Sequence, residues 1–258
     1  MKSDLGTMTT KKSFFISDLH LFSRRSSAPK WESAFRSSVL QAHTFVLGGD
    51  IFDFRWSTQA TLSHAIQDSI DWLKRLLDLN PSCNFHYLLG NHDCHPEFVE
   101  ALNELADATS HLVWHRHFLR LDDCVFLHGD IVDARVRIGE DCDEVLDAKR
   151  LAGELRDPPT ALSHALYDVA VRARVHRLVV QLAKPNEMVL RRLVRYLDKH
   201  DLSNATGVNR VYFGHTHRPV NAVLYSGMEF FNPGATIKGL PFNVIETEAP
   251  PLPISQWK

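Results

Sequence analysis

Short apolar runs recur along the chain, and each one ends in a group of polar side chains. The runs are Phe14-Phe15-Ile16, Phe45-Val46-Leu47, Tyr87-Leu88-Leu89, Val125-Phe126-Leu127 and Val211-Tyr212-Phe213. Runs of this length that are bounded by turn-forming residues predict strands. The polar groups that follow them are Asp18-Leu19-His20, Gly49-Asp50, Gly90-Asn91-His92-Asp93, His128-Gly129-Asp130 and Gly214-His215-Thr216-His217. Ligands of open α/β sheets collect beyond the carboxyl ends of strands, so we expect these five ends to converge on one site.

Segments with apolar residues at helical spacing lie between these strands. Residues 31–43 and 58–79 have this spacing, and residues 96–106 add a third helix whose first turn contains Pro96. Residues 113–127 instead predict a strand, a turn and a second strand, and residues 220–246 predict further strands. The mixture predicts an α/β fold of the α+β type, in which two sheets pack face to face as a sandwich flanked by helices.

The stretch from 134 to 204 differs, because it has almost no strand character. Its apolar residues follow helical spacing, at Leu162, Leu166, Val169 and Ala173 and again at Leu190, Leu193 and Leu197. A stretch of this length is too long for a plain loop, so we expect a helical cap inserted into the sandwich. The polar groups run from residue 18 to residue 217, and any cut would split them. The sequence therefore predicts a single domain over residues 1–258.

Composition fits one domain with a sizeable core, since 44% of the 258 residues are hydrophobic. A net charge of −2 argues against a general nucleic-acid-binding surface. The four cysteines show no C-x-x-C spacing, which predicts neither a disulfide framework nor a zinc site of cysteine thiolates. No signal peptide or membrane span is readable, so we expect a cytoplasmic protein for which peripheral membrane contact stays open.

Two pairs of potential metal ligands have the same spacing. Asp18 and His20 are two residues apart, as are His215 and His217. In an extended strand the two members of each pair project from the same face and can close on one region. Both pairs are therefore candidate metal ligands.

Further oxygen and nitrogen ligands follow the other strands. Asp50 comes directly after two glycines and is the best candidate for a carboxylate shared between two ions, while Asn91 supplies a neutral oxygen and His128 an imidazole. Imidazoles suit manganese, iron or zinc better than magnesium or calcium. We expect Asp53 and Asp130 to orient histidines or to satisfy loop amides rather than to bind metal.

The charge balance of such a site favours a phosphate substrate. Two divalent ions bring four positive charges, and Asp18 and Asp50 return two negative ones. Paired ions roughly 3.5–4 Å apart would hold a bridging hydroxide that attacks phosphorus in line. His92 could protonate the leaving oxygen or stabilise charge on the phosphoryl group, with Asp93 fixing the orientation of its ring.

The ordered series DLH, GGD, GNHD, HGD and GHTH resembles the calcineurin-like metallophosphoesterase superfamily. The resemblance implies a two-sheet sandwich flanked by helices and a phosphomonoesterase, phosphodiesterase or pyrophosphatase. It also implies a ligand set for each of two divalent ions, for which the imidazoles favour manganese, iron or zinc. The first ion would be held by Asp18, His20, Asp50 and His217, and the second by Asp50, Asn91, His128 and His215.

Several sequence features also resemble the UDP-2,3-diacylglucosamine pyrophosphohydrolase branch, among them the motif GHTHRP and the long predicted helical insertion. That branch cleaves a nucleotide-lipid pyrophosphate and covers the acyl chains with a helical cap. Its best-known members carry arginine where this chain has His92. Two alternatives stay open beside this one: a phosphoesterase with another substrate, and a catalytically idle scaffold of the same fold. A nuclease is disfavoured because no basic groove is evident, and a Ser/Thr protein phosphatase because GNHD replaces GNHE.

A basic stripe marks the last part of the predicted cap. Arg191, Arg195 and Lys199 recur every four residues, beside the apolar face of the same segment. The stripe is either a solvated surface or a site that binds the distal part of an anionic, lipid-bearing substrate. The expected partner is thus a phosphorylated small molecule or a nucleotide-lipid, not a nucleic acid.

Overall fold

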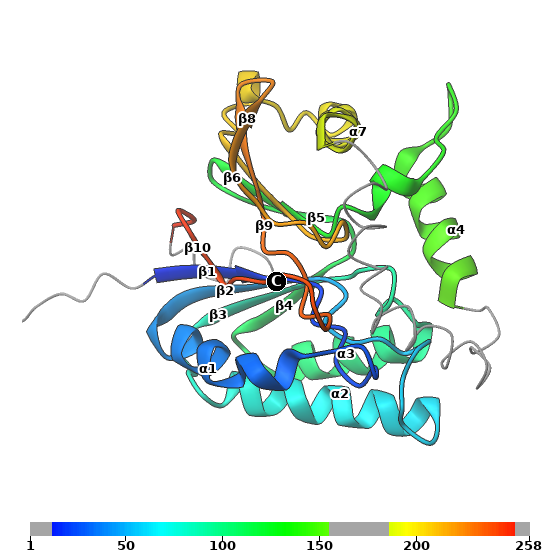
Figure 1. Cartoon of the computed structure of the whole chain (residues 1–258), viewed down its shortest axis with the longest axis vertical. Coiled ribbons are helices and arrows are strands. Elements are labelled where there is room, and N and C mark those ends of the chain that lie inside the picture. The colour runs from blue at the N-terminus through cyan, green and yellow to red at the C-terminus, as the bar shows by residue number, and fades with distance from the viewer. Residues whose placement is uncertain (1–11, 155–185, 251–258) are drawn as a thin grey trace, which may run out of the picture.

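Two five-stranded sheets pack face to face (Figure 1). In this computed structural model, residues 12–154 and 186–250 are described. The first sheet has the order β10-β1-β2-β3-β4, in which β10 is antiparallel and the other neighbours are parallel. Its strands are β1 (Lys12–Ile16), β2 (Ala42–Gly48), β3 (Asn84–Leu88), β4 (Leu112–His115) and β10 (Ile245–Thr247).

The second sheet has the order β5-β6-β7-β9-β8. Parallel pairing joins β6 to β7 and β7 to β9, and antiparallel pairing adds one strand at each edge. Its strands are β5 (Phe118–Leu121), β6 (Cys124–Leu127), β7 (Arg210–Phe213), β8 (Val220–Tyr225) and β9 (Met228–Asn232). The predicted sandwich is confirmed.

Aromatic side chains fill the space between the sheets. Phe15 of β1 meets Phe126 of β6 and Tyr212 of β7, with ring centroids 5.7 and 6.0 Å apart. Its neighbours Phe14 and Ile16 belong instead to the core on the other face of the first sheet. This alternation follows from the period of two in a strand. Both faces of the first sheet are covered, which explains why its strands are continuous apolar runs and do not alternate between apolar and polar residues.

Three helices cover the outer face of the first sheet (Figure 1). They are α1 (Glu32–Gln41), α2 (Leu62–Leu77) and α3 (Pro96–Ala108). Each of them lies on a segment predicted to be helical, with ends that differ by a few residues. There are also three short 3-10 helices: η1 (Ala28–Trp31) before α1, η2 (Asp130–Asp133) after β6 and η3 (Asn204–Thr206) before β7.

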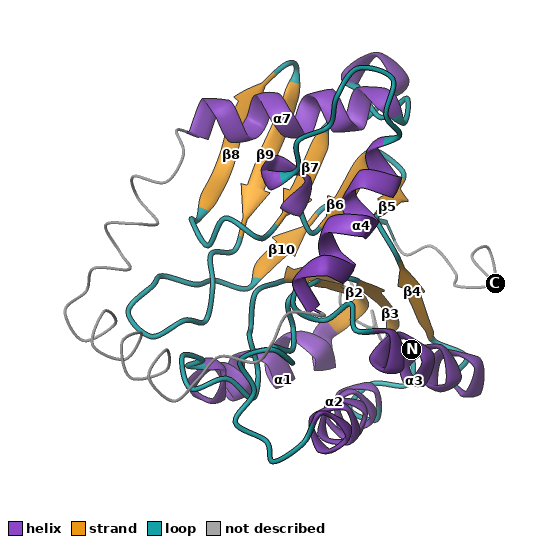
Figure 2. Cartoon of the chain, turned by 90° about the vertical axis from the view of Figure 1, so that its right-hand side faces the viewer, coloured by secondary structure: helices purple, strands orange, loops and turns teal. Residues whose placement is uncertain are grey.

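Each described part of the predicted cap contains an α-helix, α4 (Cys142–Glu154) in the first and α7 (Asn186–Lys199) in the second, while residues 134–141 are not helical. Leu190, Leu193 and Leu197 of α7 are buried against the second sheet, where they join the core formed by β6, β7 and β9 (Figure 2). The apolar face predicted for this segment is therefore its buried face. The predicted helical pattern from Leu162 to Ala173 lies outside the described residues. Among the described helices, none is both long and apolar enough to cross a membrane.

Candidate metal centre

The loops that follow five strands meet where the two sheets come together. One potential ligand atom from each of Asp18, His20, Asp50 and His217 lies within 4.8 Å of the others. A second group, with the same spacing limit, consists of Asp50, His128 and His215. Asp50 is common to both groups, as expected for a carboxylate shared between two ions. β1, β2 and β3 of the first sheet and β6 and β7 of the second supply these loops.

In the first group, nitrogen and oxygen atoms face each other around a common point. His217 Nε2 lies 3.2 Å from Asp18 Oδ1 and 3.1 Å from His20 Nε2. His20 Nε2 is 4.0 Å from both Asp18 Oδ1 and Asp50 Oδ2. The latter separations are too long for hydrogen bonds but suit ligands that surround one ion.

In the second group, one nitrogen of His128 is directed inward. Its Nδ1 lies 3.0 Å from the carbonyl oxygen of Gly48, which can only accept, so Nδ1 donates there. Nε2 then faces the site, 3.3 Å from Asp50 Oδ2 and 3.3 Å from Asn91 Oδ1. A backbone carbonyl that fixes the tautomer in this way is typical of metal-binding histidines.

The backbone at these positions is strained. The left-handed region, which non-glycine residues seldom adopt, holds Asp18 (φ 55°), His20 (46°), Asp50 (52°), His215 (63°) and His217 (56°). The predicted ligand pairs therefore converge through left-handed turns beyond the strands, and not by alternation within an extended strand, which corrects that expectation. Concentrated strain of this kind is a feature of functional sites.

Two glycines leave room for the carboxylates. A Cβ atom on Gly90 would overlap the carboxylate of Asp50, and one on Gly214 would overlap that of Asp18. Side chains at these two positions would push the acids out of place. The cradle thus fits the predicted ligands, and the donor set of carboxylate, amide and imidazole groups fits divalent transition metals.

Asp53 connects two histidines behind the site. Its Oδ1 lies 3.1 Å from Nδ1 of His92, and its Oδ2 lies 3.5 Å from Nδ1 of His20 and 2.6 Å from Nη2 of Arg25. Burial would raise the pKa of Asp53, but the charges of His92 and Arg25 hold it well below its usual range. Asp53 therefore orients histidines, as we expected, while sequence reasoning did not identify Arg25.

Asp93 has a different role from the one predicted. Its carboxylate accepts hydrogen bonds from the backbone of Ile51 and Gly90 and from the hydroxyl of Tyr87. These bonds hold the loop after β2 against the loop after β3. The ring of His92 is oriented by Asp53 and not by Asp93, which corrects the prediction. Adjacency in sequence was misleading here because consecutive side chains in this loop diverge.

The local charges determine the protonation of His92. Burial alone would lower its pKa, but the negative charges of Asp53 and Asp50 raise it to about 9. Its Nδ1 is directed at Asp53, and its side chain keeps 20% of its surface exposed. A protonated ring held by one nitrogen can present the other as a hydrogen-bond donor to a substrate.

His20 and His215 show the opposite shift. Burial and the charge of Arg25 lower the pKa of His20 to about 4, and burial and the charge of His128 lower that of His215 to about 4. Both rings are therefore neutral near pH 7. Neutral imidazole is the form that binds metal.

The chain matches the calcineurin-like phosphoesterase family over residues 12–219. It belongs to this family. The match spans all five motifs, and it confirms the resemblance drawn from them. A search of curated protein sequences gave no match. Among solved structures, the chain is similar to a dimetal phosphatase from Danio rerio, with 15% sequence identity, 88% of each chain covered and a TM-score of 0.45.

Membership in this family makes the chain a metal-dependent phosphoesterase and implies two divalent metal ions. All seven predicted ligands lie in the loops that meet at the centre, and His92 lies beside them with its ring centroid 5.1 Å from that of His20. Sequence reasoning assigned no role to Asp133, whose Oδ2 lies 3.1 Å from Nε2 of His215.

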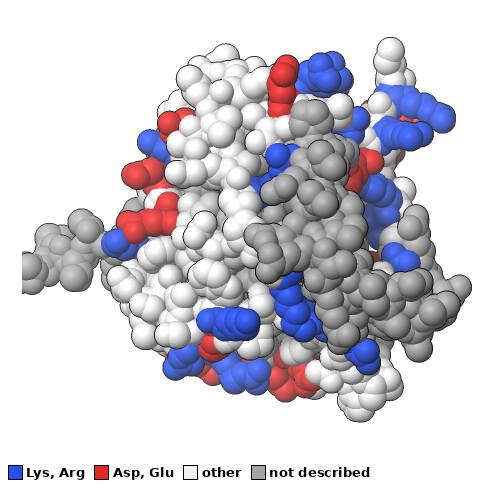
Figure 3. Space-filling model, viewed as in Figure 1, with Lys and Arg blue, Asp and Glu red and all other residues white. Residues whose placement is uncertain are grey.

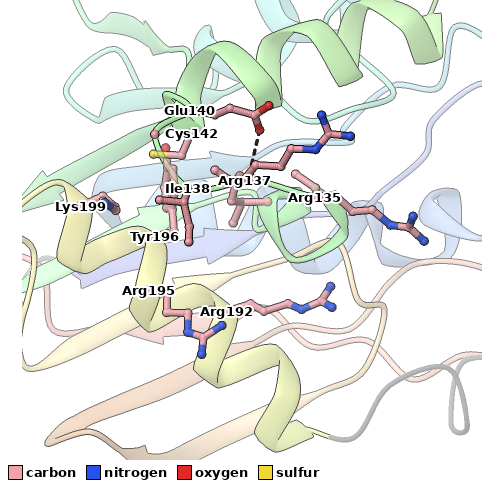
Figure 4. A pocket seen from close by; sticks show the side chains of 13 residues that line it. Arg135, Arg137, Ile138, Glu140, Cys142, Arg192, Arg195, Tyr196 and Lys199 are labelled. Atoms are coloured by element: carbon pink, nitrogen blue, oxygen red, sulfur yellow. Dashed lines mark hydrogen bonds between the residues drawn. The ribbon is translucent and has the colours of Figure 1, made fainter.

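A pocket of about 550 Å³ lies between α7 and the segment that precedes α4. Its lining includes Ala134, the residue after Asp133, and residues from α7 and from the segment before α4 (Figure 4). Figure 3 shows Lys and Arg side chains at the upper right, where Figure 1 places the segment before α4, and others along the lower edge of the molecule. Of the two predicted substrate-binding arginines, Arg195 lines this pocket, whereas Arg191 is exposed outside its lining.

Proposed function

We propose that this phosphoesterase hydrolyses a phosphate ester or pyrophosphate bond with two divalent ions held by the seven predicted ligands. The observation that carries the proposal is the position of Asp50 in both ligand groups. When bound, the ions would activate a water molecule as the nucleophile and polarise the phosphoryl group. The imidazole-rich donor set favours manganese, iron or zinc.

His92 acts on the substrate in this proposal. With its pKa raised to about 9, the ring is protonated at neutral pH and can donate from Nε2 to a phosphoryl or leaving-group oxygen. Asp53 keeps Nδ1 bound and thereby fixes the direction of Nε2. Arg25 in turn binds Asp53, which keeps the carboxylate ionised.

The pocket would bind the part of the substrate that is not cleaved. Its cationic lining comes from two sides, with Arg192 and Arg195 on α7 and Arg135 and Arg137 on the segment before α4 (Figure 4). Arg192 also donates a hydrogen bond to the carbonyl of Val132, which ties α7 to η2. An anionic group is the natural occupant of such a lining.

A nucleotide-lipid pyrophosphate is the second candidate, in the manner of UDP-2,3-diacylglucosamine hydrolysis. The observation that favours it is apolar surface in the same pocket, where Ile138 is fully exposed and Val136 is 39% exposed. Exposed aliphatic side chains beside cations suit a ligand with acyl chains near anionic groups. His92 in place of the branch's arginine argues for a different way of contacting the phosphate.

The test is a panel of substrates with and without metal. Purified protein, stripped with chelator and reloaded with manganese, iron or zinc, would be assayed on an aryl phosphomonoester, an aryl phosphodiester and nucleotide pyrophosphates with and without acyl chains. We expect turnover that needs added metal. Metal binding without turnover of any compound would favour the idle scaffold, and full turnover in chelator would refute the proposal.

A further inference from the structure

A second cluster of potential ligands lies where α4 begins and α7 ends, apart from the proposed catalytic ions. It consists of Cys142, Asp143 and His200, each of which offers one ligand atom within 4.8 Å of the others. Nε2 of His200 lies 3.7 Å from Sγ of Cys142 and 3.3 Å from Oδ1 of Asp143. All three side chains are partly buried.

One nitrogen faces both other members of this cluster. Nε2 of His200 lies opposite the thiol of Cys142 and the carboxylate of Asp143. Thiolate, carboxylate and imidazole are three of the groups that bind zinc in proteins. A cation between the three atoms would contact all of them at once.

The spacing suits a small thiophilic ion. Zinc binds sulfur at about 2.3 Å and nitrogen or oxygen at about 2.0–2.2 Å in tetrahedral geometry, so its ligand atoms are about 3.3–3.7 Å apart. The two distances around His200 have this size. One thiolate and one carboxylate would also balance the two positive charges of the ion.

Neighbouring side chains hold the cluster in place. His117 lies with Nδ1 3.3 Å from Oδ2 of Asp143 and Nε2 2.9 Å from Oδ1 of Asp147. The hydroxyl of Tyr196 donates to Oδ1 of Asp143 at 2.7 Å. Partners of this kind orient the ligands of metal sites and help to keep them in position.

We propose that Cys142, Asp143 and His200 bind one zinc ion, with water as the fourth ligand. The ion would fasten the start of α4 to the end of α7, the two described ends of the helical insertion. The cysteine spacing predicted no zinc site, because C-x-x-C spacing identifies only sites with two neighbouring cysteines. Here a single cysteine meets a histidine from a different helix.

Burial and the nearby charges of Asp143 and Asp141 raise the pKa of Cys142 when no ion is bound. A bound cation would reverse this effect, since a coordinating thiol is deprotonated. Binding is therefore expected to release a proton. Cys142 also lines the pocket that we propose for the substrate. The test of the zinc site does not use activity, so its failure is distinguishable from failure of the proposed function.

Cobalt(II) is the probe, because a thiolate bound to cobalt gives a charge-transfer absorption in the near ultraviolet. The seven ligands of the proposed catalytic centre include no cysteine, so this absorption reports only the cluster. Metal-free full-length protein titrated with cobalt is expected to develop the band and to lose it when zinc is added. Absence of the band in folded protein would overturn the proposal.

Variants test the assignment of the ligands. Cys142→Ser is expected to abolish the band, and His200→Gln to weaken cobalt binding by at least about tenfold, the effect of about 1.4 kcal/mol. Cys94→Ser is the matched control, since Cys94 is also partly buried but is not part of the cluster. Circular dichroism would verify folding. A band that persists in Cys142→Ser, or is lost in folded Cys94→Ser, would contradict the assignment. If a variant does not fold, the cobalt titration of the unmodified protein remains the test of the site.

Discussion

The metal centre and the helices α4 and α7 use different means to place their charged side chains. At the centre, Asp18 and Asp50 are buried, and their positions follow from strand ends, left-handed turns and glycines. On α7, Arg195 and Lys199 are exposed, while the apolar face of the helix packs against the second sheet and Arg192 binds the carbonyl oxygen of Val132. The strands and their turns therefore fix the side chains of the centre, whereas in the function we propose α7 would contact the uncleaved part of the substrate.

One buried ion pair joins the two regions. Arg150 of α4 binds both carboxylate oxygens of Asp130 at 2.8 Å, two residues after His128. Arg150 also donates to the carbonyl oxygen of Arg116. Asp130 thus holds the insertion against the centre, whereas we expected it to orient a histidine or satisfy a loop amide.

Removal of the shared carboxylate is the most severe test of the centre. Asp50→Ala is expected to lose at least one of the two ions and nearly all turnover, because both ligand groups contain Asp50. Metal content by elemental analysis and kcat on an aryl phosphate would be measured together. Asp107→Ala, an exposed substitution on α3, is the control and should retain both. Wild-type turnover in Asp50→Ala would contradict the two-ion centre.

His92 separates catalysis from metal binding. His92→Ala is expected to lower kcat by about 10²–10⁴-fold while metal content is unchanged, as for the loss of a general acid. The loss should be smaller for a leaving group that needs no proton. Because His92 must be protonated to donate, and the charge of Asp53 raises its pKa, wild-type kcat should fall as the pH rises and the ring loses its proton. Exposed His64→Ala is the control, and equal losses for good and poor leaving groups would indicate phosphate binding instead.

The sequence predicted the parts of the structure that local pattern controls. The apolar runs placed the strands that carry the centre, and the order of the motifs identified the family. Residues 113–127 were harder, because they form β4, β5 and β6 in two different sheets. Nothing in their alternation shows that the chain crosses from one sheet to the other after His115.

Side-chain partners were the other limit. Asp93 follows His92 directly, yet Asp53 contacts the ring because the two loops meet only in the folded chain. The four-residue periodicity likewise predicted that Arg191 and Arg195 would both bind substrate. Their rotation about α7 relative to the pocket depends on how the helix packs, so only the structure distinguishes them.

The ion pair between the regions gives the next largest effect. Arg150→Met leaves the buried carboxylate of Asp130 without its partner, and we expect a loss of about 3–5 kcal/mol in the free energy of unfolding. Arg116→Met is the control, since Arg116 and Asp147 form an exposed pair worth about 0–1 kcal/mol. Urea denaturation measures both. Equal losses would contradict the distinction between the pairs.

The same pair has a predictable dependence on pH. Burial would raise the pKa of Asp130, but the charge and hydrogen bonds of Arg150 lower it below its ordinary value of 3.8. Its stabilisation is therefore complete above that ordinary value and is lost as the pH falls further. The difference between wild type and Arg150→Met should shrink on acidification, and a difference that grows instead would show that another group is responsible.

The smallest expected effect is on the pocket, and it compares two arginines of one helix. Arg195→Glu places a negative charge in the pocket lining, whereas Arg191→Glu makes the same change at an exposed position outside it. We expect Arg195→Glu to raise KM for an anionic nucleotide substrate about tenfold, which corresponds to about 1.4 kcal/mol. Hydrolysis of a small aryl phosphodiester should be nearly unchanged in both variants, because that compound does not reach the pocket. Similar KM values for the two variants would indicate that the basic stripe is only a solvated surface. Reduced hydrolysis of both substrates in Arg195→Glu alone would indicate that α7 positions the metal centre itself.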